Sequence, residues 1–127
     1  MPVEVYPFLS HDDMLRLYGQ ARVAIGLSIS DGISHGFMEA MIMGAFPIQS
    51  YTACVDEWAQ DGVTSCFVDP EDPHNIAAAI RKVVSDDGLV DRAAEINMQV
   101  ARERLDHSII RPIVISMYNK VLGLVGE

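Results

Sequence analysis

Two acidic residues, Asp31 and Glu39, flank a stretch whose residue types could bind a polar ligand. Between them lie Gly32, Ser34, His35 and a second glycine, followed by a helical run that ends near Gly44. The first N–H groups of a helix have no partner inside that helix, so a flexible turn leading into one is a ready binding site for phosphate. Glu39 could accept hydrogen bonds from the vicinal hydroxyls of a ribose, and Asp31 from a sugar hydroxyl.

The same spacing also has a purely structural explanation. Asp31 and Glu39 would favour the dipole of the following helix, and the two glycines would simply form a tight turn. On spacing alone, this structural explanation is the better of the two.

Composition excludes several classes of function. The 127-residue chain has 18 acidic and 9 basic residues, and its formal net charge of −9 repels nucleic acid and anionic lipid. Half of the residues are hydrophobic, as in a globular domain. Cys54 and Cys66 are expected to be buried, reduced thiols of a cytoplasmic protein, because they lie beside apolar residues without metal-binding spacing. The four histidines are scattered, so no metal site is expected.

Strands and helices alternate along the chain. Strands are predicted at residues 3–6, 23–27, 46–50 and 65–68, and the apolar run 23–27 suits a central strand buried on both faces. Helices are predicted at residues 11–22, 54–60, 73–84, 89–104 and 108–122. A further helix is predicted to begin near His35 and to stop at Gly44. Ser10 and Asp72 have the position and chemistry of N-caps, and Gly44 that of a helix stop.

This alternation predicts an α/β fold with about four parallel strands flanked by helices, followed by trailing C-terminal helices. The whole chain, residues 1–127, is expected to form one domain. In such sheets, ligands bind beyond the carboxyl ends of the strands. The loop after residue 27 lies at one of these ends, which places residues 31–39 at the predicted site.

A longer segment around this site resembles a known family. The stretch "SISDGISHGFMEAMIMGAFPI" is similar to the signature of the retaining, nucleotide-sugar-dependent glycosyltransferases of the GT-B superfamily, family 4 (glycosyl transferases group 1). There, two glutamates separated by seven residues open a helix that continues as "EAMA.G.PV". Asp31 stands in the first acidic place, and Glu39 and Gly44 match the rest. The flanking segments "MLRLYGQARVAIGLS" and "DEWAQDGVTSCFVDPEDPHNIAAAIRKVVSDD" extend the likeness over residues 5–87.

The resemblance implies a role for each matching residue. Asp31 would contact the donor sugar and is the candidate for catalysis, and Glu39 would bind the ribose. Residues 32–36 would surround the donor sugar and diphosphate: Gly32, Ile33, Ser34, His35 and Gly36, with the backbone N–H groups of the middle three as the donors. The ligand would be a UDP- or GDP-sugar, and no metal would be required.

The resemblance also covers only part of the family's architecture. The chain corresponds to the back half of the Rossmann-like, C-terminal donor-binding domain, whereas the basic Arg and Lys pair and the N-terminal acceptor domain lie outside the likeness. We therefore expect weak donor binding and no efficient transfer by this chain alone. The alternative is a non-catalytic remnant or interaction domain that keeps the GT-B half-fold. A phospho-acceptor receiver domain is excluded, because Ser28 follows the predicted central strand where an aspartate is needed.

Departures from the family pattern lie around the same site. Asp31 is one methylene shorter than the usual glutamate, and Ser34 occupies the place of a frequent glycine. Ala53 and Cys54 replace a glycine-rich turn, and Ser65 replaces another glycine. These differences bear on the choice of donor sugar and on the approach of the backbone to phosphate.

Overall fold

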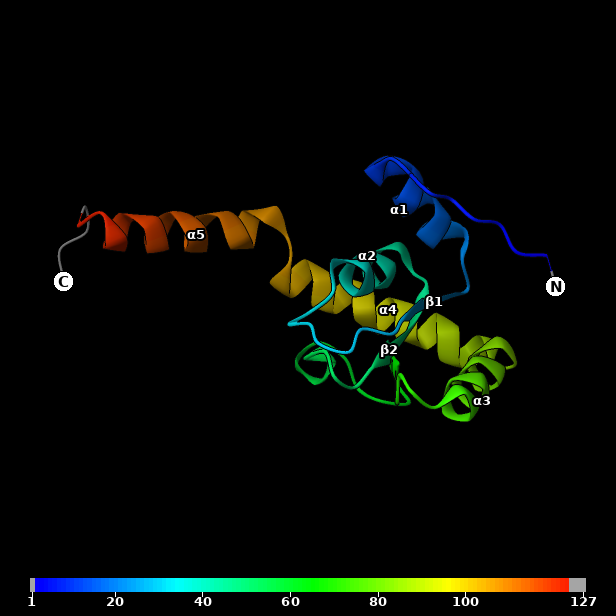
Figure 1. Ribbon diagram of the computed structural model, residues 1–127. Coiled ribbons are helices and arrows are strands. Elements are labelled where there is room, and N and C mark those ends of the chain that lie inside the picture. Colours follow the sequence, from blue (N-terminus) through cyan, green and yellow to red (C-terminus); the bar gives the residue numbers. More distant parts are fainter. Residues whose placement is uncertain (1, 124–127) are drawn as a thin grey trace.

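A parallel sheet with helices on both faces forms the body of the protein (Figure 1). The computed structural model describes residues 2–123. Its strands β1 (Val23–Gly26), β2 (Phe46–Ser50) and β3 (Cys66–Val68) lie in the order β1-β2-β3. The helices are α1 (His11–Gln20), α2 (His35–Met43), α3 (Pro73–Val84), α4 (Asp87–Arg104) and α5 (His107–Val121), with a short 3-10 helix, η1 (Val55–Glu57). The predicted α/β class with a parallel sheet is confirmed.

The helix ends follow the local signals in the sequence. Ser10 caps α1 by accepting a hydrogen bond from the amide of Asp13, and Asp72 caps α3 in the same way. Gly44 ends α2 with φ +89°, a left-handed conformation that a residue with a Cβ adopts at a penalty. Local chemistry thus sets where α1 and α3 begin and where α2, the helix of the predicted site, ends.

The sheet has three strands where the sequence predicted about four. Residues 3–6 form no strand, and the N-terminal segment runs away from the sheet (Figure 1). Val5 is 81% exposed. A strand is stable only when a neighbouring strand completes its backbone hydrogen bonds. The alternation of residue types at 3–6 does not show whether such a neighbour is present.

The second wrong prediction concerns β1. Within residues 2–123, β1 pairs only with β2, so it is an edge strand, and Ile25 is 47% exposed. The central position belongs to β2, whose five residues are all buried. An apolar run indicates burial, but it does not say which strand lies in the middle of the sheet.

Two hydrophobic clusters make up the core. The first joins β2 and β3 to α3 and the start of α4 and consists of Phe46, Ile48, Cys66, Val68, Val83, Leu89, Val90 and Ala93. The second packs α2 against the segment after β2 and the end of α4, through Phe37, Met41, Ala53, Val55 and Ala101. Because α4 contributes its start to the first cluster and its end to the second, the burial of apolar surface along this helix fixes α2 relative to the sheet.

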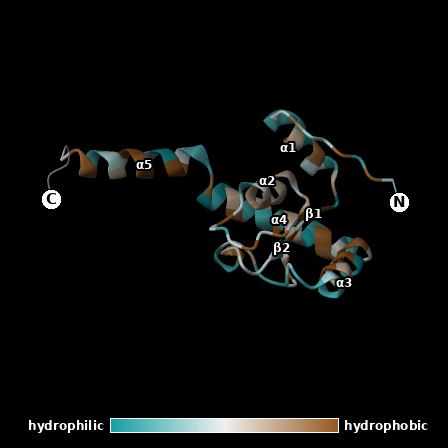
Figure 2. Cartoon of the chain, in the orientation of Figure 1, coloured by the Kyte–Doolittle hydropathy of each residue, from teal (hydrophilic) through white to brown (hydrophobic). Residues whose placement is uncertain are grey.

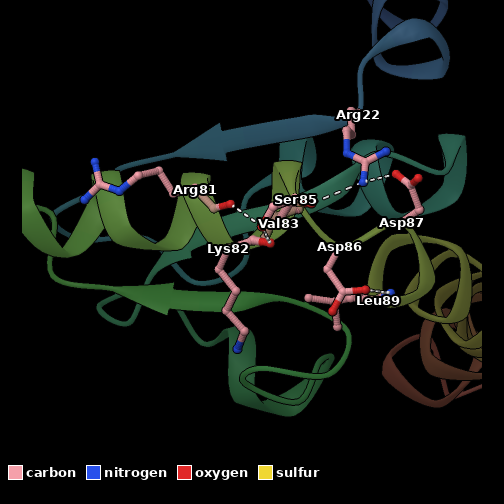
Figure 3. A network of polar contacts seen from close by, with 8 residues as sticks. All are labelled: Arg22, Arg81, Lys82, Val83, Ser85, Asp86, Asp87 and Leu89. Atoms are coloured by element: carbon pink, nitrogen blue, oxygen red, sulfur yellow. Dashed lines mark hydrogen bonds and ion pairs between the residues drawn. The ribbon is translucent and has the colours of Figure 1, made fainter.

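A polar network anchors the start of β1 (Figure 3). The guanidinium of Arg22 lies 2.6 Å from a carboxylate oxygen of Asp87 and donates to the carbonyl of Val83 at 3.3 Å. Asp86 caps α4 by accepting from the amide of Leu89 at 2.8 Å. These contacts hold the amino end of β1 against the turn between α3 and α4.

The two trailing helices are confirmed, but they differ in their packing. Helix α4 contributes to both core clusters, whereas α5 extends away from the body and has no buried residue (Figure 1). Hydrophobic residues recur along α5 (Figure 2). None of the helices within residues 2–123 has the length and apolarity needed to cross a membrane.

Candidate functional site

The loop between β1 and α2 carries the predicted site and is held by the segment that follows β2. The carbonyl oxygen of Ser28 accepts hydrogen bonds from the hydroxyls of Ser50, at 2.6 Å, and Thr52. Ser50 is buried at the carboxyl end of β2. The neighbouring strand therefore fixes the start of the loop through side-chain hydroxyls.

Asp31 and Gly32 are held through their backbones. Asp31 forms an isolated parallel bridge with Ala53, and the carbonyl of Gly32 accepts from the amide of Cys54 at 2.6 Å. The side chain of Asp31 is exposed. The loop thus presents the Asp31 carboxylate to solvent from a fixed backbone.

The first turn of α2 offers free amides. Ser34 is the N-cap, and its hydroxyl oxygen accepts from the amide of Phe37 at 3.2 Å. His35 and Gly36 are the first two residues of the helix, so their amides have no acceptor inside it. Within the described residues, no hydrogen bond uses the amide of residues 33–36. These N–H groups and the helix dipole create positive potential at the start of α2.

Glu39 lies one turn further along α2 and contacts α1. One of its carboxylate oxygens accepts a hydrogen bond from Nε2 of His11 at 2.8 Å, and the Glu39 side chain is 21% exposed. Burial raises the pKa of Tyr18, and the nearby Glu39 charge raises it further. The sequence predicted His11 as a surface residue; its ring is exposed, but it contacts a predicted site residue, which its position in the sequence did not indicate.

A cavity of about 130 Å³ lies beneath the first turn of α2, between this helix, Tyr18 of α1 and the strands β1 and β2. Ser34 and Gly36 line it on the side of α2. A Cβ at position 36 would come 2.9 Å from the hydroxyl oxygen of Tyr18, so that hydroxyl lies directly against the glycine. The absence of a side chain at Gly36 therefore lets Tyr18 reach the start of α2.

Gln49 forms part of the opposite wall of this cavity. Its side chain is 2% exposed and lies against Gly26, where a Cβ would be 2.2 Å from Oε1. Its Nε2 has no hydrogen-bond partner within residues 2–123. The sequence prediction missed Gln49, although an amide directly after the apolar residues Phe46, Pro47 and Ile48 of a buried strand was a visible signal.

On its other side, α2 borders an open groove of about 290 Å³. Glu39 and His35 line this groove together with Leu105, at the end of α4. The structure therefore brings Ser34 and Gly36 to the cavity, and His35 and Glu39 to the groove, whereas Asp31 lines neither.

One of the two cysteines differs from its predicted burial. Cys66 is buried, as expected, but Cys54 is exposed because it lies in the loop between β2 and η1. Both are free thiols. In residues 2–123, no three His, Cys, Asp or Glu side chains form a group that could hold a metal ion.

A comparison with protein families shows to which family the chain belongs. Residues 2–100 match the family described as glycosyl transferases group 1. The chain belongs to this family. A comparison with curated proteins gave no match.

Solved structures show the same fold as this glycosyl transferases group 1 chain. Sucrose-phosphate synthase from Thermosynechococcus elongatus is 18% identical, with a TM-score of 0.84 over 92% of this chain. The Anabaena protein HepE, solved in complex with UDP, is 17% identical, with a TM-score of 0.75 over 83%. A glycosyltransferase from Rickettsia africae is 20% identical, with a TM-score of 0.77 over 91%.

The matched region is a small part of each of these proteins. The chain spans 29% of the sucrose-phosphate synthase and of HepE, and 31% of the Rickettsia glycosyltransferase. The three strands and their helices correspond to part of the Rossmann-like half of a GT-B fold. The family and the partial GT-B fold inferred from the sequence are confirmed.

Proposed function

We propose that this chain is the nucleotide-sugar donor-binding part of a retaining glycosyltransferase, which moves a sugar from a nucleoside diphosphate to an acceptor. One observation carries the proposal: in a chain of this family, the amides of residues 33–36 have no acceptor among residues 2–123, and Glu39 follows one turn later in α2. Unpaired amides at a helix start bind phosphate without any cationic side chain.

Different site residues bind different parts of the nucleotide-sugar donor. The amides of residues 33–36 hold the diphosphate, and Glu39 accepts hydrogen bonds from the ribose hydroxyls. The bond from His11 uses one of the two carboxylate oxygens of Glu39 and orients that side chain. Asp31, exposed on the fixed loop, contacts the donor sugar and is the candidate catalytic residue.

The chemistry that these groups supply is electrostatic. Negative charge develops on the leaving diphosphate as the bond to the sugar breaks, and oriented amides stabilise this charge without reorganising. We propose a UDP- or GDP-sugar as the donor, without a metal; the complex of HepE with UDP supports a uridine nucleotide. The acceptor would be held by an N-terminal domain, in a cytoplasmic enzyme of glycan biosynthesis that binds neither nucleic acid nor membrane through this segment.

A second candidate function is a non-catalytic domain that keeps the GT-B half-fold. One observation favours it: none of the residues that line the cavity under α2 is a lysine or an arginine. A dianionic ligand at this cavity would therefore depend on neutral donors alone. The two candidates differ in whether the chain binds a nucleoside diphosphate.

Isothermal titration calorimetry with UDP, GDP and uridine tests the proposal. We expect saturable binding of UDP or GDP, which Glu39→Gln weakens by about tenfold or more, because the ribose hydroxyls then bond to a neutral amide oxygen in place of a charged carboxylate. Glu95→Gln, an exposed position on α4, is the matched control and should bind like the unmodified chain. If neither nucleotide gives saturable heat, the non-catalytic function stands instead. An equal loss in both variants would also contradict the role of Glu39.

A further inference from the structure

The cavity under α2 contains a buried donor without an acceptor. The Gln49 side chain is 2% exposed, and its Nε2 has no partner within the described residues. A buried amide that has lost its hydrogen bonds to water destabilises a fold unless another group replaces them. Gln49 is one of the residues that line the cavity, so its amide is the buried, unpaired group beside an acceptor held there. The orphaned nitrogen is thus evidence for an occupant.

Gly26 makes this position of Gln49 possible. A Cβ on residue 26 would lie 2.2 Å from Oε1 of Gln49, closer than a Cβ approaches another atom, and 3.2 Å from Nε2, a tight contact. The carboxamide therefore occupies the space that any other residue at position 26 would fill. The pair of residues places an amide group at the wall of the cavity instead of an apolar side chain.

The other polar groups of the cavity are also donors. The hydroxyl of Tyr18 lies beside Gly36, and the Ser34 hydroxyl, whose oxygen already accepts from Phe37, can donate its own proton. No carboxylate of residues 2–123 lines this cavity. The start of α2 adds the positive end of its dipole. Several donors at the positive end of a helix, with no carboxylate among them, favour an oxyanion over a neutral ligand.

The size of the cavity agrees with a phosphoryl group. A water molecule needs roughly 10–15 Å³ of cavity volume. The cavity of about 130 Å³ therefore admits a group of several non-hydrogen atoms. We propose that Gln49, together with Tyr18, contacts a phosphoryl group in this cavity and thereby determines which ligand the site accepts. When that group belongs to a nucleoside diphosphate, this inference rests on the proposed function; free inorganic phosphate has the same chemistry.

The test compares three probes on four variants of the 127-residue chain. The probes are inorganic phosphate, UDP and uridine, with binding measured by calorimetry. Gln49→Met keeps the length of the side chain and removes its amide, and Gln99→Met, at an exposed position on α4, is its control. Tyr18→Phe removes only the hydroxyl, and Tyr118→Phe, exposed on α5, is its control.

We expect Gln49→Met to weaken the binding of the phosphate-bearing probe by about tenfold or more, and Tyr18→Phe to weaken it less, while both controls bind normally. The urea midpoint of Gln49→Met should stay the same or rise, because the variant removes an unpaired buried donor. A purely structural role for Gln49 predicts the reverse, a lower midpoint with unchanged binding, and would overturn the inference.

The outcomes also separate this inference from the proposed function. Normal UDP binding by Gln49→Met overturns the inference and leaves the proposed function standing. Binding of inorganic phosphate that depends on Gln49, without binding of UDP, supports the inference and contradicts the proposed function. Should Gln49→Met fail to fold, the unmodified chain still decides: the NMR signals of the Gln49 side-chain amide must shift with phosphate or UDP but not with uridine. Unshifted signals mean that only water fills the cavity, which overturns the inference.

Discussion

Cys54 and Cys66 show how surroundings, more than residue type, set the chemistry of a side chain. Cys66 is the first residue of β3 and lies in the first hydrophobic cluster, where burial raises the pKa of its thiol although the charge of Lys82 partly opposes this. Cys54 is exposed between β2 and η1. Since the thiolate is the reactive form, both burial and the raised pKa make the Cys66 thiol poorly reactive, whereas the Cys54 thiol is accessible.

The first prediction at this scale is selective thiol labelling. In the folded protein, an aromatic disulfide reagent should modify one thiol per chain rapidly, and the second only after urea is added. Cys54→Ser should abolish the rapid reaction, whereas Cys66→Val should leave it unchanged. Rapid modification of two thiols in the folded chain would contradict the burial of Cys66.

The raised pKa of Cys66 also predicts a dependence of stability on pH. A thiol that stays protonated in the folded state adds stability that is fully present below the pKa of the unfolded thiol, about 8.5, and is lost as the pH rises through the higher folded value. The free energy of unfolding in urea should therefore fall as the pH rises above about 9. The fall should be smaller in Cys66→Val, and an identical fall in both proteins would assign it to other groups, of which Tyr18 is one because its pKa is also raised.

At the scale of elements, α2 depends on chemistry at its two ends. Ser34 begins the helix with a side-chain cap, and Gly44 ends it with a positive φ of 89°. Between them, Phe37, Ala40 and Met41 are buried and hold the helix in place. The amides proposed to bind phosphate point from the start of this helix, so the packing of its middle positions them.

Gly44→Ala should lower the free energy of unfolding by about 1–2 kcal/mol, since an L-residue pays this penalty in the left-handed region. Gly32→Ala is the control for stability, because its φ is not positive and no atom lies within 4 Å of a Cβ added there. Urea unfolding measures both. Equal effects of the two substitutions would mean that the conformation of Gly44 does not limit stability.

The contrast between local and tertiary effects explains which elements the sequence could predict. The cap at Ser10, the stop at Gly44 and the start of α3 at Asp72 depend on neighbouring residues in the chain, and all three were predicted correctly. The strand predicted at residues 3–6 and the central position predicted for residues 23–27 depend on neighbours in the sheet, and both predictions were wrong.

The same limit applies to the candidate site. The segment from Ser34 to Glu39 could be located from its own residues. His11, Tyr18 and Gln49 reach the site from α1 and β2, and only the packing of these elements against α2 reveals them. Residue spacing within one segment does not report such contacts.

In the whole molecule, stability resides in the sheet and its two core clusters, and not in α5. Ile48 lies at the centre of the sheet with 0% exposure, whereas Ile113 on α5 is 52% exposed. Ile48→Ala should lower the free energy of unfolding by about 2–5 kcal/mol. Ile113→Ala should change it by less than about 0.5 kcal/mol, measured by urea unfolding under the same conditions. A large loss from Ile113→Ala would show that α5 contributes to the folded core.

Charge at the same scale opposes the proposed ligand. With a formal net charge of −9, the molecule as a whole repels a nucleoside diphosphate. Binding therefore requires the local positive potential of the first amides of α2, which acts only at close range. The central claim is that these amides, and not a general attraction, hold the ligand.

The most direct test of this claim is a titration with UDP followed by amide-resolved NMR. We expect the largest shifts on the amides of residues 33–36 and smaller shifts at Glu39, and we expect that uridine alone does not reproduce them. Saturable shifts located elsewhere in the protein, or none at residues 33–36 when UDP is present in excess, would contradict it.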